Sequence, residues 1–466
     1  RLQVRTSPLN GPYLTRCMAS EVSNPVKKEE AEATPDMPAP LISVWTGPAL
    51  KFELVAECSK SLARHCRIFF PDHCPNGPVE TPVYMPVGTQ GTIKGVTVAQ
   101  LEAMDYRILL GNAYHLGHRP GPEILTRAGG LHTFMSWPRG ILTDSGGFQM
   151  VSLSKLSSTE EHGTRFCSPH DGSQMLLTPE ESVGRIQASI GSDIVMQLDH
   201  VLHVTTTGEA ISDATRRSVR WLDRCIKAHE QQLSKQNLFA ITQGALDAEL
   251  RKECIGEMIK RKDQIQGFAI GGLSGGEAKS DFCRIVDLST RLLPRDRPRY
   301  LMGVGFPVDM VVCTALGCDM FDCVFPTRTA RFGQALVRWG QVNLRLNSYS
   351  CDFRPIDEEC PCPACAKGDG SGVSRAWLHA ALGARQPNAA SYVTLHNLTY
   401  LFNLMKSLRE AIKEDRLPQL IRDFFHLRCR PPAGSGDQPE NNAIEYEFDS
   451  PPAWCVHALR KVNIEL

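Results

Sequence analysis

Three carboxylates stand at the ends of apolar runs in the sequence, and this placement is the first sign of chemistry. Asp144 ends the run in "GILTDSGG", Asp199 the run in "SDIVMQLDH" and Asp322 the run in "CDMFDCVFPTR". A carboxylate in such a place can serve as a nucleophile or as a general acid or base. A turn alone would also account for Asp-Ser-Gly-Gly, because these residues favour turns on backbone grounds.

A cysteine cluster is the second candidate site. Cys360, Cys362 and Cys365 form a C-x-C-x2-C pattern in "ECPCPACAKG". Three thiolates this close together favour one Zn²⁺ ion, and sulfur-rich zinc sites are structural rather than catalytic. His396 and His379 are the candidates for the fourth ligand, and we take His396 first. Chance clustering in a chain with 17 cysteines is the alternative.

Between about residues 80 and 335, apolar runs alternate with predicted helices, and these elements must position the candidate residues. Apolar runs lie at 140–147, 192–200, 237–244, 267–276, 299–305 and 318–328, and helices are predicted at 178–191, 209–229 and 280–294, the last beginning at Ser280. Continuous apolar strands that alternate with amphipathic helices indicate a parallel sheet. Six visible units favour an α/β fold, a TIM (β/α)8 barrel, over a doubly wound sheet, which would usually show an early glycine-rich turn.

The barrel changes the interpretation of the three acids. The residues that follow the strands of a (β/α)8 barrel all face one mouth. The side chains and glycines expected there are Asp144, Asp199, Gln243, Gly271, Gly272, Met302, Gly303 and Asp322. Turn propensity explains one acid at a strand end, but it does not explain three acids, a glutamine and three glycines.

The composition of the chain limits the classes of protein to which it can belong. The chain has 466 residues, 42% of them hydrophobic, and a formal net charge of zero. Bulk charge therefore gives no sign of a nucleic-acid partner, although a local basic patch can hold one. No apolar run reaches the length that spans a bilayer. The scattered cysteines indicate a reducing compartment. Residues 1–50 are rich in proline, serine, alanine and glutamate, a composition that buries little surface, so we expect disorder there rather than a transit peptide.

Four stretches carry a resemblance to a known family. "LTDSGGFQM", "IGGLSGGE", "RYLMGVG" and "MFDCVFPTRTARFG", with the cysteine cluster behind them, resemble the tRNA-guanine transglycosylases, most closely their eukaryotic catalytic subunits. The resemblance runs from about residue 52 to 425. It implies a barrel over 51–425 with a zinc-binding subdomain at about 345–400. The disordered extension (1–50) would precede it, and a loop and C-terminal segment (426–466) would follow.

The resemblance also implies an activity and its residues. The family exchanges guanine at the wobble position of tRNA anticodons for queuine through a covalent aspartyl–ribosyl intermediate, with retention. Retention needs two displacements. Asp322 matches the nucleophile and Asp144 the general acid/base. The base-binding positions are Ser145, Phe148, Asp199, Gln243, Gly271, Gly272, Leu273, Gly275 and Met302, and the tRNA-binding positions are Arg328 and Arg331.

Other expectations follow from the same resemblance. Gly275 favours queuine over its smaller precursor, because bacterial relatives tend to carry a bulkier residue there. The implied partners are a tRNA anticodon loop, queuine and a homologous non-catalytic subunit in a heterodimer, with no DNA and no transmembrane segment. The implied location is the cytoplasm, with peripheral association with the mitochondrial outer membrane. Departures from the family pattern are His200, Ala245, which could tighten the pocket, "GDGSGV" (368–373) and the loop at 431–450.

Two rival functions remain at this point. A non-catalytic tRNA-binding homologue would share the fold, but the presence of both Asp144 and Asp322 argues against it. A metal-dependent barrel hydrolase would need zinc ligands at the strand ends and an open coordination position. The cysteines lie outside the barrel repeats instead.

Overall fold

The computed structural model describes residues 43–47, 49–73, 77–147, 157–167, 172–232, 235–366, 372–429 and 450–466. Phe148, most of the predicted N-terminal extension, nearly all of the 431–450 loop and most of the "GDGSGV" segment lie outside these residues. The last part of the predicted extension, Ser43–Thr46, is strand β1, which pairs antiparallel with β2.

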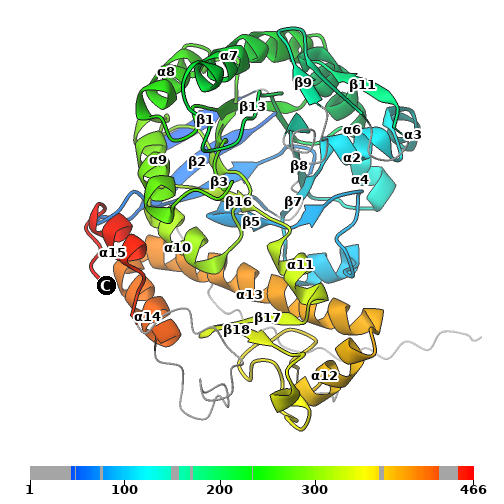
Figure 1. The fold of residues 1–466 in the computed structure, drawn as a ribbon, viewed down its shortest axis with the longest axis vertical. Coiled ribbons are helices and arrows are strands. Elements are labelled where there is room, and N and C mark those ends of the chain that lie inside the picture. The colour runs from blue at the N-terminus through cyan, green and yellow to red at the C-terminus, as the bar shows by residue number, and fades with distance from the viewer. Residues whose placement is uncertain are drawn as a thin grey trace, which may run out of the picture. The chain divides into compact units, whose positions relative to one another are not determined.

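A closed parallel barrel forms the centre of the fold and confirms the predicted TIM architecture (Figure 1). Its strands are β5 (Val83–Met85), β6 (Val87–Gly88), β7 (Ile108–Gly111), β8 (Gly140–Thr143), β12 (Ile194–Met196), β13 (Asn237–Thr242), β14 (Gly267–Ile270), β15 (Arg299–Leu301) and β16 (Met320–Asp322). β5 pairs with β16 and β6 pairs with β7, so these two are halves of one strand, divided at Pro86. The doubly wound alternative is wrong, because an open sheet has two unpaired edges.

Helices form the outer layer because each buries one apolar face against the strands. They are α1 (Val98–Ala103), α2 (Ala113–His118), α3 (Pro122–Ala128), α4 (Leu131–Met135), η1 (Glu180–Gln187), α6 (Ala188–Ile190), α7 (Glu209–Glu230), α8 (Ala248–Ile259), α9 (Lys279–Leu292) and α10 (Pro307–Ala315). The predicted helix at 209–229 is confirmed as α7. The predicted start of α9 at Ser280 is wrong, since Ala278 is its N-cap residue.

The helix predicted at 178–191 is present, but most of it is a π-helix. The π-helical part is η1, and Gly191 ends the segment with a φ of +68°. Before it comes a small antiparallel sheet that the sequence did not indicate. This sheet consists of β9 (Ser157–Thr159), β10 (Thr164–Cys167) and β11 (Gln174–Leu177). Both features lie between β8 and β12, the strands that precede Asp144 and Asp199.

A four-stranded antiparallel sheet closes the N-terminal end of the barrel. Its strands are β1, β2 (Lys51–Glu57), β3 (Arg64–Phe69) and β4 (Val79–Thr81). Phe52 and Ile68 of this sheet share one buried core with side chains of the barrel strands. Arg64 joins the two layers, because its guanidinium donates to both carboxylate oxygens of Asp319, at 2.9 and 2.6 Å. The opposite, C-terminal mouth is left for a site.

The chain after β16 forms a second, smaller core. It comprises α11 (Phe325–Arg331), β17 (Gln334–Val337), β18 (Gly340–Asn343), a 3-10 turn (Asn347–Tyr349), α12 (Arg375–Gly383), α13 (Pro387–Lys413), α14 (Leu417–Cys429) and α15 (Ala453–Arg460). In Figure 1, α13 runs between the barrel and the β17–β18 hairpin. The separate core spans Ala330 to Val393 and includes Cys362 and Cys365.

Two further properties concern the described residues as a whole. None of their helices combines the length and the apolar character that a membrane crossing requires. The cysteines of this described part of the chain form no disulfide.

Candidate active site and metal centre

The strand exits bring the candidate residues to one end of the barrel. Asp144 follows β8, Gln243 follows β13, Gly271 follows β14 and Met302 follows β15, while Asp322 is the last residue of β16. Asp199 lies three residues after β12. Since neighbouring strands are parallel, their carboxyl ends share one mouth.

Asp144 is a buried carboxylate held by the first residues after β7. Its Oδ2 accepts a hydrogen bond from Asn112 Nδ2 at 2.6 Å, and its Oδ1 accepts one from the backbone N–H of Ala113 at 2.8 Å. Only 7% of Asp144 is exposed. The sequence did not single out Asn112, although it stands at the end of an apolar run, which is the signal that marked Asp144.

Asp322 is held through one of its two oxygens. Its Oδ1 accepts hydrogen bonds from Tyr300 Oη at 2.5 Å and from Gly303 N at 2.8 Å. Both of these donors reach the same carboxylate oxygen. Burial raises the pKa of Asp322 to about 6, even though these two hydrogen bonds lower it. Sequence reasoning missed Tyr300, because a tyrosine inside an apolar run is typical of a core residue.

The three carboxylates follow strands of one parallel barrel, Ser145 next to Asp144 donates to Asp199, and the pKa shifts of Asp199 and Asp322 agree with a common location. The charge of Asp144 contributes to raising the pKa of Asp322, after burial and against the hydrogen bonds. The same charge contributes to raising the pKa of Asp199, which burial brings to about 6. Coulomb interactions weaken with distance, so acids that perturb one another in this way lie near one another. The convergence expected from a barrel is therefore present.

Asp199 is the centre of a polar network with two other base-binding candidates. Its Oδ1 accepts from Ser145 Oγ at 2.9 Å, and its Oδ2 accepts from Gln243 Nε2 at 2.6 Å. All three side chains are buried. The network joins the exits of β8, β12 and β13, and it presents hydrogen-bonding groups in a nearly dry environment.

Two glycines let the next strand exit approach this network closely. A Cβ at Gly271 would lie 2.5 Å from Ile241 Cγ2, and a Cβ at Gly272 would lie 2.4 Å from Gln243 Oε1. Arg251, fully buried and missed by the sequence analysis, donates to the carbonyl oxygens of Thr242 and Gly271 at 2.9 and 3.0 Å. These contacts place the backbone of 271–273 beside Gln243.

The remaining base-binding candidates lie around the same exits. Leu273 and Met302 are partly buried hydrophobic side chains packed against the two main cores. Gly275 faces the loop after β12, since a Cβ there would come within 3.1 Å of Val204 Cγ1.

Two of the departures from the family pattern, His200 and Ala245, make contacts with the outer helices. His200 Nδ1 lies 3.0 Å from Arg217 Nη1 on α7, and burial lowers the pKa of His200 to about 4. Ala245 has a φ of +44° and packs in a small core with Ile211 and Leu250. The methyl group of Ala245 thus packs against side chains of α7 and α8.

Arg328 and Arg331 lie on α11, the helix that starts three residues after Asp322. Both side chains are exposed. Two exposed guanidinium groups next to the mouth can bind phosphate or the edges of bases.

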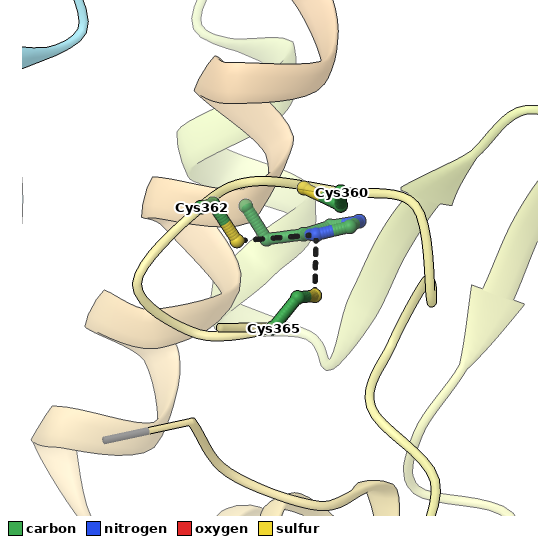
Figure 2. Close-up of side chains that lie close together, drawn as sticks. Cys360, Cys362 and Cys365 are labelled. Atoms are coloured by element: carbon green, nitrogen blue, oxygen red, sulfur yellow. Dashed lines mark hydrogen bonds between the residues drawn. The ribbon is translucent and has the colours of Figure 1, made fainter. Parts of the chain in front are cut away.

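The cysteine cluster and His396 form a compact set of metal-ligating atoms. The ligand atoms of Cys360, Cys362, Cys365 and His396 all lie within 4.8 Å of one another. Figure 2 shows the three cysteines on one loop with their sulfur atoms turned toward a common centre. His379 is not in the group, because its Nδ1 lies 3.1 Å from the Leu344 carbonyl oxygen instead.

The geometry of this cluster fits a tetrahedral ion. His396 Nδ1 lies 3.6 Å from Cys362 Sγ and 3.3 Å from Cys365 Sγ. Zn–S and Zn–N bonds of ordinary length place such ligand atoms about 3.6 Å apart. His396 Nε2 donates to the Leu336 carbonyl oxygen at 2.6 Å, which leaves Nδ1 free to bind a metal. These residues could therefore hold a metal ion.

Comparisons with known proteins agree with this arrangement. A model of the queuine tRNA-ribosyltransferase family matches residues 58–430. A queuine tRNA-ribosyltransferase catalytic subunit of Schizosaccharomyces pombe is 49% identical over 421 residues, which are 90% of this chain and 98% of the relative. One from Caenorhabditis elegans is 53% identical over 84% of this chain and 95% of its own length. A queuine tRNA-ribosyltransferase of Bacillus subtilis is 42% identical over 81% of this chain and 95% of its own length.

The family match covers the barrel, the carboxylates at its mouth and the cysteine cluster, and the relatives are similar along nearly their whole length. The chain therefore belongs to the queuine tRNA-ribosyltransferase family and is a pentosyltransferase.

Proposed function

We propose that the protein exchanges guanine at the wobble position of tRNA anticodons for queuine. The observation that carries this proposal is the meeting of Asp144, Asp199 and Asp322 at one barrel mouth, in a chain of this family. One carboxylate can attack the ribose, one can handle the proton and one can bind the base. The presence of both reacting acids favours this function over a non-catalytic tRNA-binding homologue.

Asp322 is the nucleophile in this proposal. Tyr300 and Gly303 hold its Oδ1, so Oδ2 attacks C1′ of the target nucleotide as the bond to guanine breaks. The ribose is then esterified to the enzyme, and the tRNA remains covalently bound. Attack by the incoming base on the opposite face of C1′ releases Asp322, and two inversions give net retention.

Asp144 is the general acid/base. It delivers a proton to the leaving guanine and takes one from the incoming base, so that each cycle ends with the protein in its starting state. The two hydrogen bonds from Asn112 and Ala113 fix the position of this carboxylate. A fixed group near both bases serves the two half-reactions in turn.

The network around Asp199 would recognise the purine. A guanine edge offers N–H donors, which a carboxylate accepts, and Ser145 and Gln243 hold that carboxylate in place. The backbone of Gly271, Gly272 and Leu273 supplies further polar groups. Phe148, outside the described residues, and Met302 would cover the two faces of the ring.

Gly275 supports queuine as the incoming base. A side chain here would extend toward Val204, whose Cγ1 lies 3.1 Å from a built Cβ. Gly275→Val should therefore raise KM for queuine and leave exchange of unsubstituted guanine nearly unchanged. Equal losses for both bases would remove the argument that glycine makes room for the larger base.

Arg328 and Arg331 would hold the anticodon loop through its phosphates and bases. The target nucleotide must leave the base stack to reach the buried acids, so we expect flipped nucleotides in the complex. Some relatives are called catalytic subunits, which supports pairing with a homologous non-catalytic subunit. Zn²⁺ is the proposed occupant of the Cys₃His site, where it would fix the second core and take no part in the exchange.

Exchange of labelled guanine into tRNA tests the proposal. Asp322→Ala and Asp144→Ala should each abolish incorporation. Asp287→Ala is a matched control, because Asp287 pairs with Arg291 on the outer helix α9. Incorporation by Asp322→Ala at the rate of the parent would eliminate the nucleophile assignment.

A further inference from the structure

A second group of metal-ligating side chains lies at the other end of the barrel. Within the described ranges, the ligand atoms of His73, His132 and Asp193 all lie within 4.8 Å of one another. Asp193 immediately precedes β12, while Asp199 follows that strand. The group is therefore at the N-terminal end of β12, apart from the acids at the mouth and from the cysteine cluster.

The two imidazoles converge on one carboxylate. His73 Nδ1 lies 2.7 Å from Asp193 Oδ1, and His132 Nε2 lies 3.1 Å from Asp193 Oδ2. The two rings are stacked, with centroids 3.6 Å apart and planes within 9° of parallel. Each ring thus points one nitrogen at a separate oxygen of the same acid.

The backbone fixes the groups from three separate elements. Asp193 Oδ2 also accepts from Ile141 N at 2.8 Å, and Asp193 N donates to the Ile141 carbonyl at 2.9 Å. His132 lies on the short helix α4, and His73 lies in the turn after β3 of the sheet that closes the barrel. A preformed arrangement of this kind reduces the ordering that ligand binding would require.

The side chains of this cluster make up a ligand set that a divalent cation can use. Asp193 is 7% exposed, and its two oxygens accept hydrogen bonds from both imidazoles and from Ile141 N, so the carboxylate is fixed as an acceptor between the two rings. A divalent ion would replace the two facing protons and give the carboxylate a cationic partner.

We propose that His73, His132 and Asp193 form a second metal site, which takes Zn²⁺ or a similar late first-row divalent cation. Two imidazole nitrogens and one carboxylate oxygen are ligands that such ions prefer, whereas Mg²⁺ and Ca²⁺ prefer oxygen alone. Tetrahedral Zn²⁺ would set the N–O separations at about 3.3 Å, so the present separations of 2.7 and 3.1 Å would widen by about 0.6 and 0.2 Å. His73 is partly exposed, with 30% of its side chain accessible, so water can complete the coordination.

The site would join the closing sheet, α4 and the start of β12. Its three protein ligands include no sulfur, so it should bind Zn²⁺ more weakly than the Cys₃His site and exchange the ion more readily. A bound ion therefore stabilises the N-terminal end of the barrel without entering the exchange chemistry.

Equilibrium dialysis of the full chain against buffered Zn²⁺, followed by elemental analysis, tests this site. We expect two zinc ions per chain at saturation, and one in His73→Ala and in His132→Ala. His457→Ala is the matched control, because His457 is exposed on α15, and it should keep two. One zinc per chain in the parent throughout the titration would overturn the proposal, as would a second zinc retained in both His variants.

Cobalt substitution supplies an independent measurement that separates the two sites. Co²⁺ at the cysteine cluster should give sulfur-to-metal charge-transfer absorption, which His73→Ala leaves intact. Co²⁺ at the second site should add only weak visible bands, and His73→Ala should remove them. Asp193→Asn keeps an oxygen acceptor for Ile141 N but loses the charge, and it should lose the weak bands as well. Weak bands that persist in both variants would overturn the assignment.

Discussion

At the scale of single residues, the activity depends on acids kept in surroundings that oppose their charge. Burial raises the pKa values of Asp322 and Asp199 to about 6, and the charge of Asp144 adds to both shifts. Hydrogen bonds from Tyr300 and Gly303 lower the pKa of Asp322 again, which keeps a carboxylate available as a nucleophile near neutral pH. Tyr300 is thus a positioning residue that also adjusts the nucleophile.

Tyr300→Phe tests that role, because it removes one donor and keeps the buried ring. We expect kcat to fall about 10- to 100-fold, since a hydrogen bond to a charged group contributes about 1.5–3 kcal/mol. The acid limb of the pH–rate profile should move to higher pH, because the lost bond had lowered the pKa of Asp322. Tyr106→Phe is the matched control: this buried hydroxyl donates to the Leu398 carbonyl at 2.8 Å, away from the mouth. An acid limb that stays in place in Tyr300→Phe would contradict the proposed role.

Asp322→Asn should make the free protein more stable. The folded pKa of Asp322 is about 6 against an ordinary 3.8, so its ionised form opposes folding. The destabilisation of the folded state by ionised Asp322 is absent below about pH 4 and complete once the pH has passed the folded pKa. The variant should therefore gain up to about 3 kcal/mol at pH 8, and its gain in Tm should shrink toward pH 5. Thermal unfolding at several pH values checks this, and a gain independent of pH would refute it.

At the scale of elements, the metal-binding loop matters because it stabilises a small core. The second core spans Ala330 to Val393, and α13 packs against it as well as against the barrel strand β5. Arg328 and Arg331 precede this core directly on α11. Loss of the loop should consequently disturb RNA binding through the fold before it disturbs the reacting acids.

Removal of the metal separates a structural role from a catalytic one. A chelator should cause a slow loss of exchange activity that follows the change in tryptophan fluorescence, because Trp339 lies in the second core. His396→Ala should lose the ion, whereas His379→Ala should keep it, since only His396 lies among the cysteines. Immediate loss of turnover with unchanged fluorescence would indicate a catalytic metal instead.

At the scale of the whole molecule, the barrel needs its N-terminal end closed so that the other end can remain a mouth. The closing sheet shares a core with the barrel, and Arg64 connects the two layers. Besides Asp319, the guanidinium donates to the carbonyl oxygens of Arg295 and Arg297, both at 2.6 Å. Only 2% of Arg64 is exposed, so this pair is a buried one.

Arg64→Met should cost about 3–5 kcal/mol of unfolding free energy, because it leaves Asp319 buried without its cation. Arg67→Met on the same strand is the matched control. Arg67 is partly exposed and lies 3.7 Å from Glu80, so its loss should cost less than about 1 kcal/mol. Urea unfolding measures both. Equal losses of unfolding free energy in the two variants would show that the connection between sheet and barrel contributes little to stability.

Much of this molecule could be predicted from its sequence, and the misses have physical reasons. The barrel and the acids were predictable because each strand–helix unit carries its own local pattern. The closing sheet was not, since its strands precede any helical pattern. The donors Asn112 and Tyr300 were missed because they bond acids 32 and 22 residues away, which only the packed strands bring close. His73 and Asp193 are 120 residues apart for the same reason.

The most direct test of the central claim is to locate a covalent adduct. Parent enzyme incubated with a short anticodon stem-loop RNA, then quenched and digested, should give a peptide that carries the ribosyl group on Asp322. Asp322→Ala should give no adduct, whereas Asp144→Ala should alter its accumulation without moving it. An adduct on Asp144 or Asp199, or continued exchange with no covalent species at any acid, would contradict the account.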